Sequence, residues 1–296
     1  SYLSNYLIGQ GGENSWRWML GVQAFPAAMF YILIHFIPES PRWLLLYRKN
    51  KAAALQILQK INPLHYNDEL EAILTSAKAT NDNGTRTSLF GRKYRFPGLL
   101  AILFAVFNQV SGINAIIYYA PRVFEMAGLG AQSSLLSTVG IGLVNFVFTL
   151  IAINIIDKVG RRILMLVGSF GMIASLAMVS CSFYSESPDG LLVTAYLMVF
   201  IAFFAFSQGA VIWVFISEIF PNEVRAKGQT LGSLTHWVMA AIITFFFPIL
   251  SEWTGGGTTF LIFAGFMVLQ LLFVWKLMPE TKGKSLELIG GTLMPK

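Results

Sequence analysis

Carboxamide side chains are grouped in a stretch of sequence that is otherwise strongly apolar. Asn108, Gln109 and Asn114 fall within seven residues, and Asn145 follows in the next apolar stretch. A carboxamide donates and accepts hydrogen bonds without carrying a charge, so it suits a neutral ligand whose hydroxyls do the same. A single asparagine in an apolar helix more often joins two helices by a hydrogen bond, but three amides this close favour a binding site.

A local break in the helix is expected between the second and third of these amides. Gln109 and Asn114 are five residues apart, which places them about 140° from one another on a regular helix. The pair Ser111 and Gly112 between them permits a break that turns both amides toward one ligand. Tyr118, one turn beyond Asn114, can then close over the site from the outer side.

The composition of the chain indicates what surrounds these residues. Of the 296 residues, 12% are charged, against about 25% in an average soluble domain, and 55% are hydrophobic. These values exclude a disordered chain, a nucleic-acid-binding tail and an ordinary water-soluble enzyme. The net charge of +6 by itself is compatible with an anionic partner, but the positions of the basic residues along the chain point to a lipid bilayer instead. The single cysteine, Cys181, excludes an intrachain disulfide framework and a cysteine zinc site.

Seven stretches are long and apolar enough to cross a bilayer, whose core forces their backbones to be helical. They are expected at residues 16–37, 97–119, 135–156, 163–183, 191–220, 228–250 and 259–278. The connecting segments alternate in charge, because all but Arg17 and Arg122 of the 21 Lys and Arg residues fall on one side. That side is expected to face the cytoplasm, which predicts a multi-pass protein of a plasma or bacterial inner membrane with a cytoplasmic linker and C-terminus.

A polar linker of mixed charge, residues 38–96, divides the chain. Within it, residues 52–61 and 68–78 have Leu, Ile and Ala at helical spacing, which predicts two short amphipathic helices. We expect a remnant of an N-terminal bundle before the linker, then a six-helix bundle and a cytoplasmic tail, at 1–37, 97–278 and 279–296 respectively. Six helices after a central linker suggest the second half of a twelve-helix transporter with two pseudo-equivalent halves.

Hydropathy alone leaves a transporter, a channel, a receptor and a membrane enzyme open, and the loop motifs narrow the choice. Five motifs occur in order at matching membrane depth, at Pro38–Trp43, Asn108–Asn114, Asp157–Arg162, Glu218–Gly228 and Pro279–Gly283. This set resembles the sugar porter family of the major facilitator superfamily, over essentially the whole chain. The resemblance implies an all-α membrane fold, with the chain corresponding to the end of helix 5 through helix 12. It also implies transport of a monosaccharide by alternating access.

The same resemblance implies which residues bind the sugar. Gln109, Asn114, Asn145 and Trp213 match family positions, and Trp213 offers a flat apolar face and an indole donor. Phe204 matches an aromatic residue that lines the same site, although simple packing explains it about equally well. The expected substrate-binding residues are Asn108, Gln109, Asn114, Tyr118, Asn145, Phe204, Trp213, His236 and Trp237.

Three positions depart from the family pattern. Asn108 stands where the family usually has glutamine, so its contact is shorter by one methylene and is either lost or bridged by water. The pair His236 and Trp237 replaces an amide followed by tryptophan. The imidazole can bind the sugar and make binding depend on pH, or it can stay neutral and bond to a neighbouring helix. The stretch Ser207–Ile212 lacks the proline that related sequences often carry, which leaves Gly209 as the only obvious flexible point.

Charged residues at the cytoplasmic helix ends are expected to form a gate. By the resemblance, they hold the inner side closed in the outward-open state, and breaking their network favours the inward-open form. An exposed ion pair contributes only about 0–1 kcal/mol, so several pairs are needed to bias two conformations. The arginines also fix membrane topology, whereas gating explains Glu218 better. The expected members are Glu39, Arg42, Asp157, Arg161, Arg162, Glu218, Arg225 and Glu280.

Other functions stay open at this level. A carrier of the same fold for another organic solute predicts a charged residue in mid-span, where only amides, hydroxyls and aromatics occur. A membrane enzyme needs clustered ligands or a nucleophile with a base, but His35, His65 and His236 are scattered over different segments. We therefore expect no catalysis, no metal and no cofactor. A sugar sensor that does not transport would have the same sequence features.

The expected partners are a monosaccharide and the lipid bilayer, with no nucleic acid, and protons are left open. In the family, proton coupling is associated with a membrane carboxylate in helix 1, which precedes the part that this chain matches. Symport and facilitated diffusion are both compatible with the sequence, and so are hexoses and pentoses. We expect the 296-residue chain by itself not to transport, because half of the sugar-facing wall lies outside it.

Overall fold

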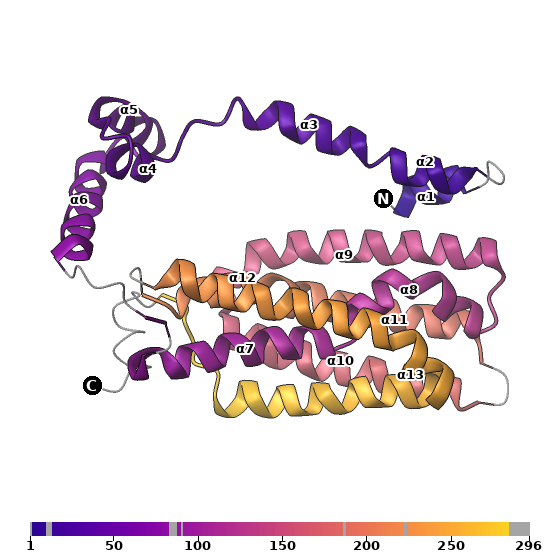
Figure 1. Cartoon of the computed structure of the whole chain (residues 1–296). Helices are drawn as coiled ribbons and strands as arrows, with labels where there is room; N and C mark the ends of the chain where they lie inside the picture. Colours follow the sequence, from indigo (N-terminus) through magenta and orange to yellow (C-terminus); the bar gives the residue numbers. More distant parts are fainter. Residues whose placement is uncertain are drawn as a thin grey trace. The chain divides into compact units, whose positions relative to one another are not determined.

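The structure, a computed structural model, describes residues 2–9, 14–82, 88–89, 91–185, 188–221 and 224–283. All regular secondary structure in these ranges is helical, which confirms the predicted all-α fold (Figure 1). The chain forms two compact units, Leu3–Thr87 and Ser88–Lys296, each considered by itself below. The division into four parts made from the sequence stays a prediction. The expected tail at 279–296 lies outside the described residues from 284 onward.

The first unit begins with apolar helices. They are α1 (Tyr2–Ile8), α2 (Ser15–Gly21) and α3 (Ala24–Ile34). Together α2 and α3 supply the span expected at residues 16–37. No residue of α3 is buried within the chain, although the helix is strongly apolar. Such a helix needs a non-aqueous environment or a further protein surface around it.

Three short helices complete the first unit. They are α4 (Pro41–Leu46), α5 (Lys51–Ile61) and α6 (Tyr66–Asp82). Pro41 opens α4, where the missing backbone N–H is not needed, and the Asn50 side chain caps α5 by accepting from the Ala53 N–H at 3.1 Å. Both amphipathic helices predicted in the linker are confirmed as α5 and α6. Their apolar faces meet α4 in a small core of Leu44, Leu45, Ala54, Leu58 and Leu70.

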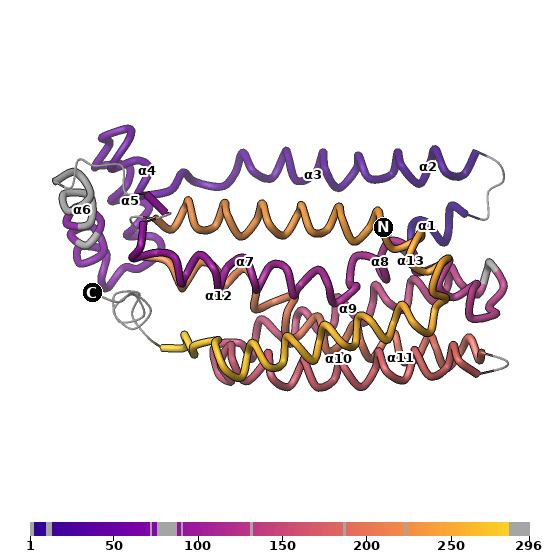
Figure 2. Tube along the Cα trace, turned by 60° about the horizontal axis from the view of Figure 1, so that its bottom comes forward, coloured from indigo at the N-terminus to yellow at the C-terminus, as the bar shows by residue number. Residues whose placement is uncertain are grey.

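The second unit is a bundle of long apolar helices (Figure 1, Figure 2). After a 3₁₀ turn at Arg92–Tyr94 come α7 (Arg95–Val110), α8 (Ile113–Met126), α9 (Ala131–Val159), α10 (Arg161–Phe183), α11 (Gly190–Phe204), α12 (Ala210–Glu218) and α13 (Arg225–Lys276). A five-residue π-helical turn, η2 (Ala205–Gly209), joins α11 to α12. The span expected at 191–220 therefore contains an irregular turn without a proline, and Gly209 is its last residue.

Two of the seven expected spans fall within α13, which is two helices joined at a kink. Among the described residues, six helical segments are long and apolar enough to cross a membrane. The last, α13, has 52 residues, about 78 Å of helix and more than twice a bilayer core of about 30 Å. Gly255, with φ 77° and ψ 163°, interrupts α13, and Figure 2 shows the chain doubling back there. The expected spans 228–250 and 259–278 are the two arms of α13.

The break predicted between Gln109 and Asn114 is confirmed. Gly112, with φ 84°, separates α7 from α8. A Cβ atom on Gly112 would lie 2.5 Å from the ring of Phe263, so both the backbone conformation and the available space require glycine. The Ser111 hydroxyl donates to the Asn108 carbonyl at 2.7 Å and accepts from the Ile113 N–H at 3.3 Å. These bonds satisfy backbone groups that the break leaves without helical partners.

Candidate functional site

Gln109 is the centre of a polar cluster that α7, α8 and α13 form together. Its Nε2 donates to Asn108 Oδ1 at 2.9 Å and lies 3.2 Å from both ring nitrogens of His236. Its Oε1 accepts from Asn114 Nδ2 at 2.8 Å. The side chains of Gln109 and Asn108 are almost completely buried, whereas Asn114 and His236 are half-buried. The break at Gly112 thus brings together the two amides that a regular helix would separate.

Aromatic side chains border this Gln109 cluster. The rings of Trp213 and His236 have centres 5.0 Å apart, and His236 meets Trp237 edge to face at 5.2 Å. Trp213 is 44% exposed and Trp237 is 60% exposed. The arrangement runs from buried amides to accessible rings. It suits a ligand that has hydroxyls along its edge and C–H groups on its face.

The other expected binding residues play no part in this cluster within the described residues. Tyr118 is exposed, and Asn145 is half-buried on α9 without a side-chain hydrogen bond. Phe204 is buried, and its ring stacks on Phe200 with centres 6.3 Å apart, as packing requires. Asn108, by contrast, belongs to the cluster, where its side-chain oxygen accepts from Gln109 Nε2. The role of each of these residues in sugar binding stays a prediction.

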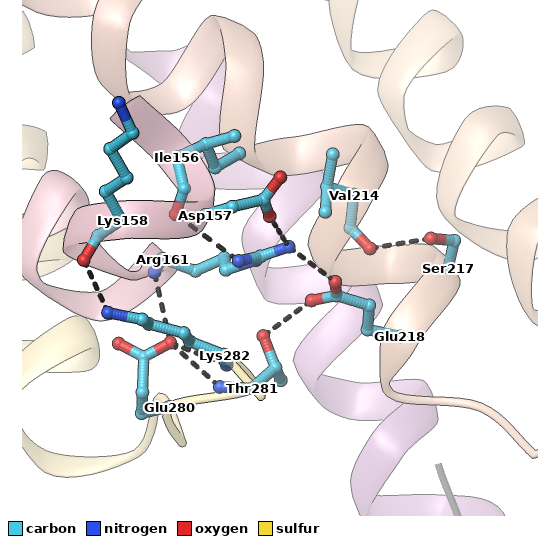
Figure 3. A network of polar contacts seen from close by, with 10 residues as sticks. All are labelled: Ile156, Asp157, Lys158, Arg161, Val214, Ser217, Glu218, Glu280, Thr281 and Lys282. Atoms are coloured by element: carbon cyan, nitrogen blue, oxygen red, sulfur yellow. Dashed lines mark hydrogen bonds and ion pairs between the residues drawn. The ribbon is translucent and has the colours of Figure 1, made fainter. Parts of the chain in front are cut away.

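A second polar network joins three helix ends around Arg161 (Figure 3). Arg161 Nη2 lies 2.8 Å from Glu218 Oε1 at the end of α12 and 2.8 Å from Asp157 Oδ1 on α9. The side chain of Arg161 is 8% exposed, that of Glu218 is 23% exposed and that of Asp157 is 77% exposed. Thr281 Oγ1 donates to Glu218 Oε2 at 2.6 Å. The Arg161–Glu218 pair is therefore the shielded member of the network, and Asp157 is its solvated member.

Glu280 caps the N-terminus of α10. Its carboxylate accepts from the backbone N–H groups of Arg161 and Arg162 at 3.0 and 3.1 Å, and from the Thr281 N–H at 3.0 Å. The first N–H groups of a helix lack helical partners and carry partial positive charge, so a carboxylate is favoured there. Gly160, with φ 101°, makes room, because a Cβ atom would lie 2.7 Å from Glu280 Oε2. The segment after α13 is thus tied to α10 and, through Thr281, to α12.

The remaining expected gate residues are placed less centrally. Arg162 donates to the Trp275 carbonyl, and Arg225 Nε donates to the Phe220 carbonyl at 3.4 Å. Glu39 and Arg42 belong to the first unit, where both are exposed. The sequence reasoning missed Thr281, although it stands in the motif that supplied Glu280.

These clusters offer hydrogen bonds and charge pairing. In the part of the chain that the structure describes, no group of three or more His, Cys, Asp or Glu side chains is placed to hold a metal ion. His35 Nδ1 bonds to the Tyr31 carbonyl of its own helix at 2.8 Å, and His65 Nδ1 lies 3.3 Å from Asp68 Oδ2.

Comparison with known proteins agrees with this geometry. A family model described as "Sugar (and other) transporter" matches residues 1–292. The chain belongs to this sugar transporter family. One relative of the chain is the arabinose-proton symporter of Bacillus subtilis. It is 39% identical over 278 residues, which are 94% of this chain and 60% of that protein. The D-xylose-proton symporter of Escherichia coli K12 is 34% identical over 301 residues, 97% of this chain and 60% of that protein.

Solved structures give the fold. The proton:xylose symporter XylE bound to 6-bromo-6-deoxy-D-glucose has a TM-score of 0.83 and 33% sequence identity, covering 99% of this chain and 63% of that chain. The chain therefore has the major facilitator fold, and the resemblance to sugar porters inferred from its motifs is confirmed. The chain spans about three fifths of the length of the relatives named here.

Proposed function

We propose that the protein carries a monosaccharide across a cell membrane by alternating access, with the second unit supplying one wall of the sugar site. The Gln109 cluster carries this proposal, because amides from α7 and α8 meet an imidazole from α13 beside an accessible tryptophan. None of these groups is permanently charged, which favours a neutral polyhydroxylated solute over an organic ion. Relatives named for arabinose, xylose and glucose support pentoses and hexoses as the substrate class.

The hydrogen bonds inside the cluster explain how a sugar enters it at low cost. The Asn114 amide donates to Gln109 Oε1. A sugar hydroxyl that both donates and accepts can take the place of either partner, so no buried amide is left unsatisfied. Trp213 then covers a C–H face of the ring, and His236 donates or accepts through one of its ring nitrogens. A solute without hydroxyls would separate the amides without replacing their bonds.

The network around Arg161 is proposed as the gate on the cytoplasmic side. Trp213 and Glu218 stand on the same short helix, α12, five residues apart. A displacement of α12 when sugar binds is therefore passed to the Arg161–Glu218 pair and to Thr281. Opening requires the loss of several bonds at once, which supplies the bias of a few kcal/mol that a two-state carrier needs.

Membrane location and orientation are part of the same proposal. The relatives are transporters of sugars, and six described segments are long and apolar enough to span a bilayer. The distribution of Lys and Arg supports a cytoplasmic location of the linker and the C-terminal tail. Proton coupling is tested by uptake with and without a proton gradient, because relatives are named both as proton symporters and as a facilitated diffusion protein.

Uptake into proteoliposomes tests the proposal. The full-length protein is reconstituted and offered radiolabelled arabinose, xylose and glucose, with leucine as a neutral solute that is not a sugar. We expect saturable uptake of at least one sugar and none of leucine, with uptake reduced by about tenfold or more in Gln109→Leu. Saturable binding without flux would identify a sensor and contradict transport. Uptake that Gln109→Leu leaves unchanged would contradict the assignment of the site.

A further inference from the structure

The second unit contains two separate apolar cores with a polar layer between them. The gate-side core, which includes Ile156, Leu164 and Phe220, lies next to the Arg161 network. The far-side core includes Ile116, Phe200 and Phe260. On α10, Met165 belongs to the gate-side core and Met172 belongs to the far-side core. In the chain from α11 to α12 the corresponding residues are Val211 and Phe204, and on α13 they are Phe273 and Met267. Midway between these pairs stand Ser169, Gln208 and Gln270, whose side chains are completely buried. The bundle therefore interrupts its apolar interior at one level on three helices.

The three polar side chains form a chain of hydrogen bonds. Gln208 Nε2 donates to Gln270 Oε1, and Gln270 Nε2 donates to Ser169 Oγ at 2.9 Å. Ser169 Oγ in turn donates to the Met165 carbonyl at 2.7 Å. Gln208 Oε1 has no hydrogen-bond partner among the described residues. A buried amide is costly unless its bonds are made, so Gln270 fixes the side chain of Gln208 and with it the backbone that carries Gln208.

That backbone is the π turn η2. Ser207, next to Gln208, donates to the Phe203 carbonyl, which belongs to the preceding turn. Two glycines of α10 let the turn approach closely. A Cβ atom on Gly168 would lie 2.0 Å from Ser207 Oγ, and one on Gly171 would lie 2.2 Å from the Phe203 ring. The π turn is thus held on one side by a glycine surface and on another by the Gln270 amide.

The π turn sets the direction in which Trp213 points. A π turn contains one residue more than an α turn, so it rotates the helix that follows by about 100° relative to a regular α-helix. Trp213 lies four residues after the end of η2. Its ring faces His236 in the Gln109 cluster at 5.0 Å. Without the π turn the indole would point about a quarter of a turn or more away from that cluster.

We propose that Ser169, Gln208 and Gln270 form a positioning layer that keeps the π turn in place and so aims Trp213 at the sugar. The inference rests on the proposed function, because it assigns the layer to the same sugar site. It makes Gln270, on the second arm of α13, a positioning residue for a tryptophan on another helix.

A double-mutant cycle between Gln270 and Trp213 tests this proposal. The dissociation constant for the transported sugar is measured on the full-length protein with Gln270→Met, Trp213→Phe and both changes, because methionine keeps the length of glutamine and removes its hydrogen bonds. We expect Gln270→Met to weaken binding about tenfold in the native background and less than about twofold when Trp213 is already phenylalanine. The matched control is Met172→Leu, a completely buried residue of the far-side core, which we expect to change binding by less than about twofold.

Equal effects of Gln270→Met in both backgrounds, or no effect in either, would overturn the positioning role. If Gln270→Met does not fold, as judged by size-exclusion chromatography, Ser169→Ala replaces it in the same cycle with the same two outcomes. A native protein that binds no sugar would instead contradict the proposed function, so the two failures are distinguishable.

Discussion

Neutralising Glu218 should loosen the network around Arg161 much more than neutralising Asp157, although both carboxylates contact the same arginine nitrogen at 2.8 Å. The Arg161–Glu218 pair is mostly shielded, so replacing its charged hydrogen bond by a neutral one in Glu218→Gln should cost about 1–2 kcal/mol. Asp157 is 77% exposed, and its pair should contribute only about 0–1 kcal/mol because water screens it. The two variants remove the same charge and differ in burial, which makes Asp157→Asn a matched control.

Hydrogen exchange measured by mass spectrometry detects this difference, because local opening of the helix ends raises the exchange rate of their backbone amides. The informative peptides cover the start of α10, the end of α12 and residues 279–283. A cost of about 1–2 kcal/mol predicts that Glu218→Gln exchanges about 5- to 30-fold faster at these helix ends, and that Asp157→Asn changes exchange by less than about fivefold. Equal acceleration in the two variants would refute the argument from burial. No acceleration in either would show that the network does not hold these ends together.

Three further changes test other parts of the account. Gly160→Ala should destabilise the second unit by about 1–3 kcal/mol, because φ is 101° and the added Cβ would meet Glu280. The expected result is a lower melting temperature, and an unchanged melting temperature would contradict this. Gly112→Ala should cost a similar amount, about 1–3 kcal/mol, because φ is 84° and the added Cβ would meet Phe263. It should also weaken sugar binding, because the break holds Gln109 near Asn114. Binding that stays native would contradict a positioning role for the break. Sugar affinity should fall as pH is lowered, because a protonated His236 cannot accept from Gln109 Nε2. His236→Asn should remove this dependence. Profiles of affinity against pH that match in the two proteins would exclude titration of His236.

Much of the fold follows from hydropathy and a few glycines. A stretch of apolar residues has to be helical in a bilayer, so the spans could be placed before their packing was known. The break at Gly112 could be predicted because serine and glycine stand between two amides. The direct junction of the two arms of α13 at Gly255 could not be predicted, because the apolar and small residues at 251–258 are also compatible with a longer loop.

The candidate site was predictable where polar residues stand in apolar segments, and less so where side chains choose their partners. Gln109 and Asn114 were found by residue type and spacing, but nothing in the spacing indicated that Asn108 would bond to Gln109. The buried layer was missed, although Gln208 and Gln270 are amides in mid-span and carried the same signal as Gln109. A π turn leaves no simple pattern in the sequence, since it depends on how α10 and α13 pack against it.

Equilibrium binding of radiolabelled sugar to two matched asparagine variants tests the central claim most directly. Asn114 belongs to the Gln109 cluster, whereas Asn154 is an exposed amide on α9 that bonds to the Leu150 carbonyl of its own helix. The account predicts that Asn114→Ala raises the dissociation constant by about tenfold or more and that Asn154→Ala changes it by less than about twofold. Equal affinity of the two variants, with both folded, would contradict the assignment of the Gln109 cluster as the sugar site.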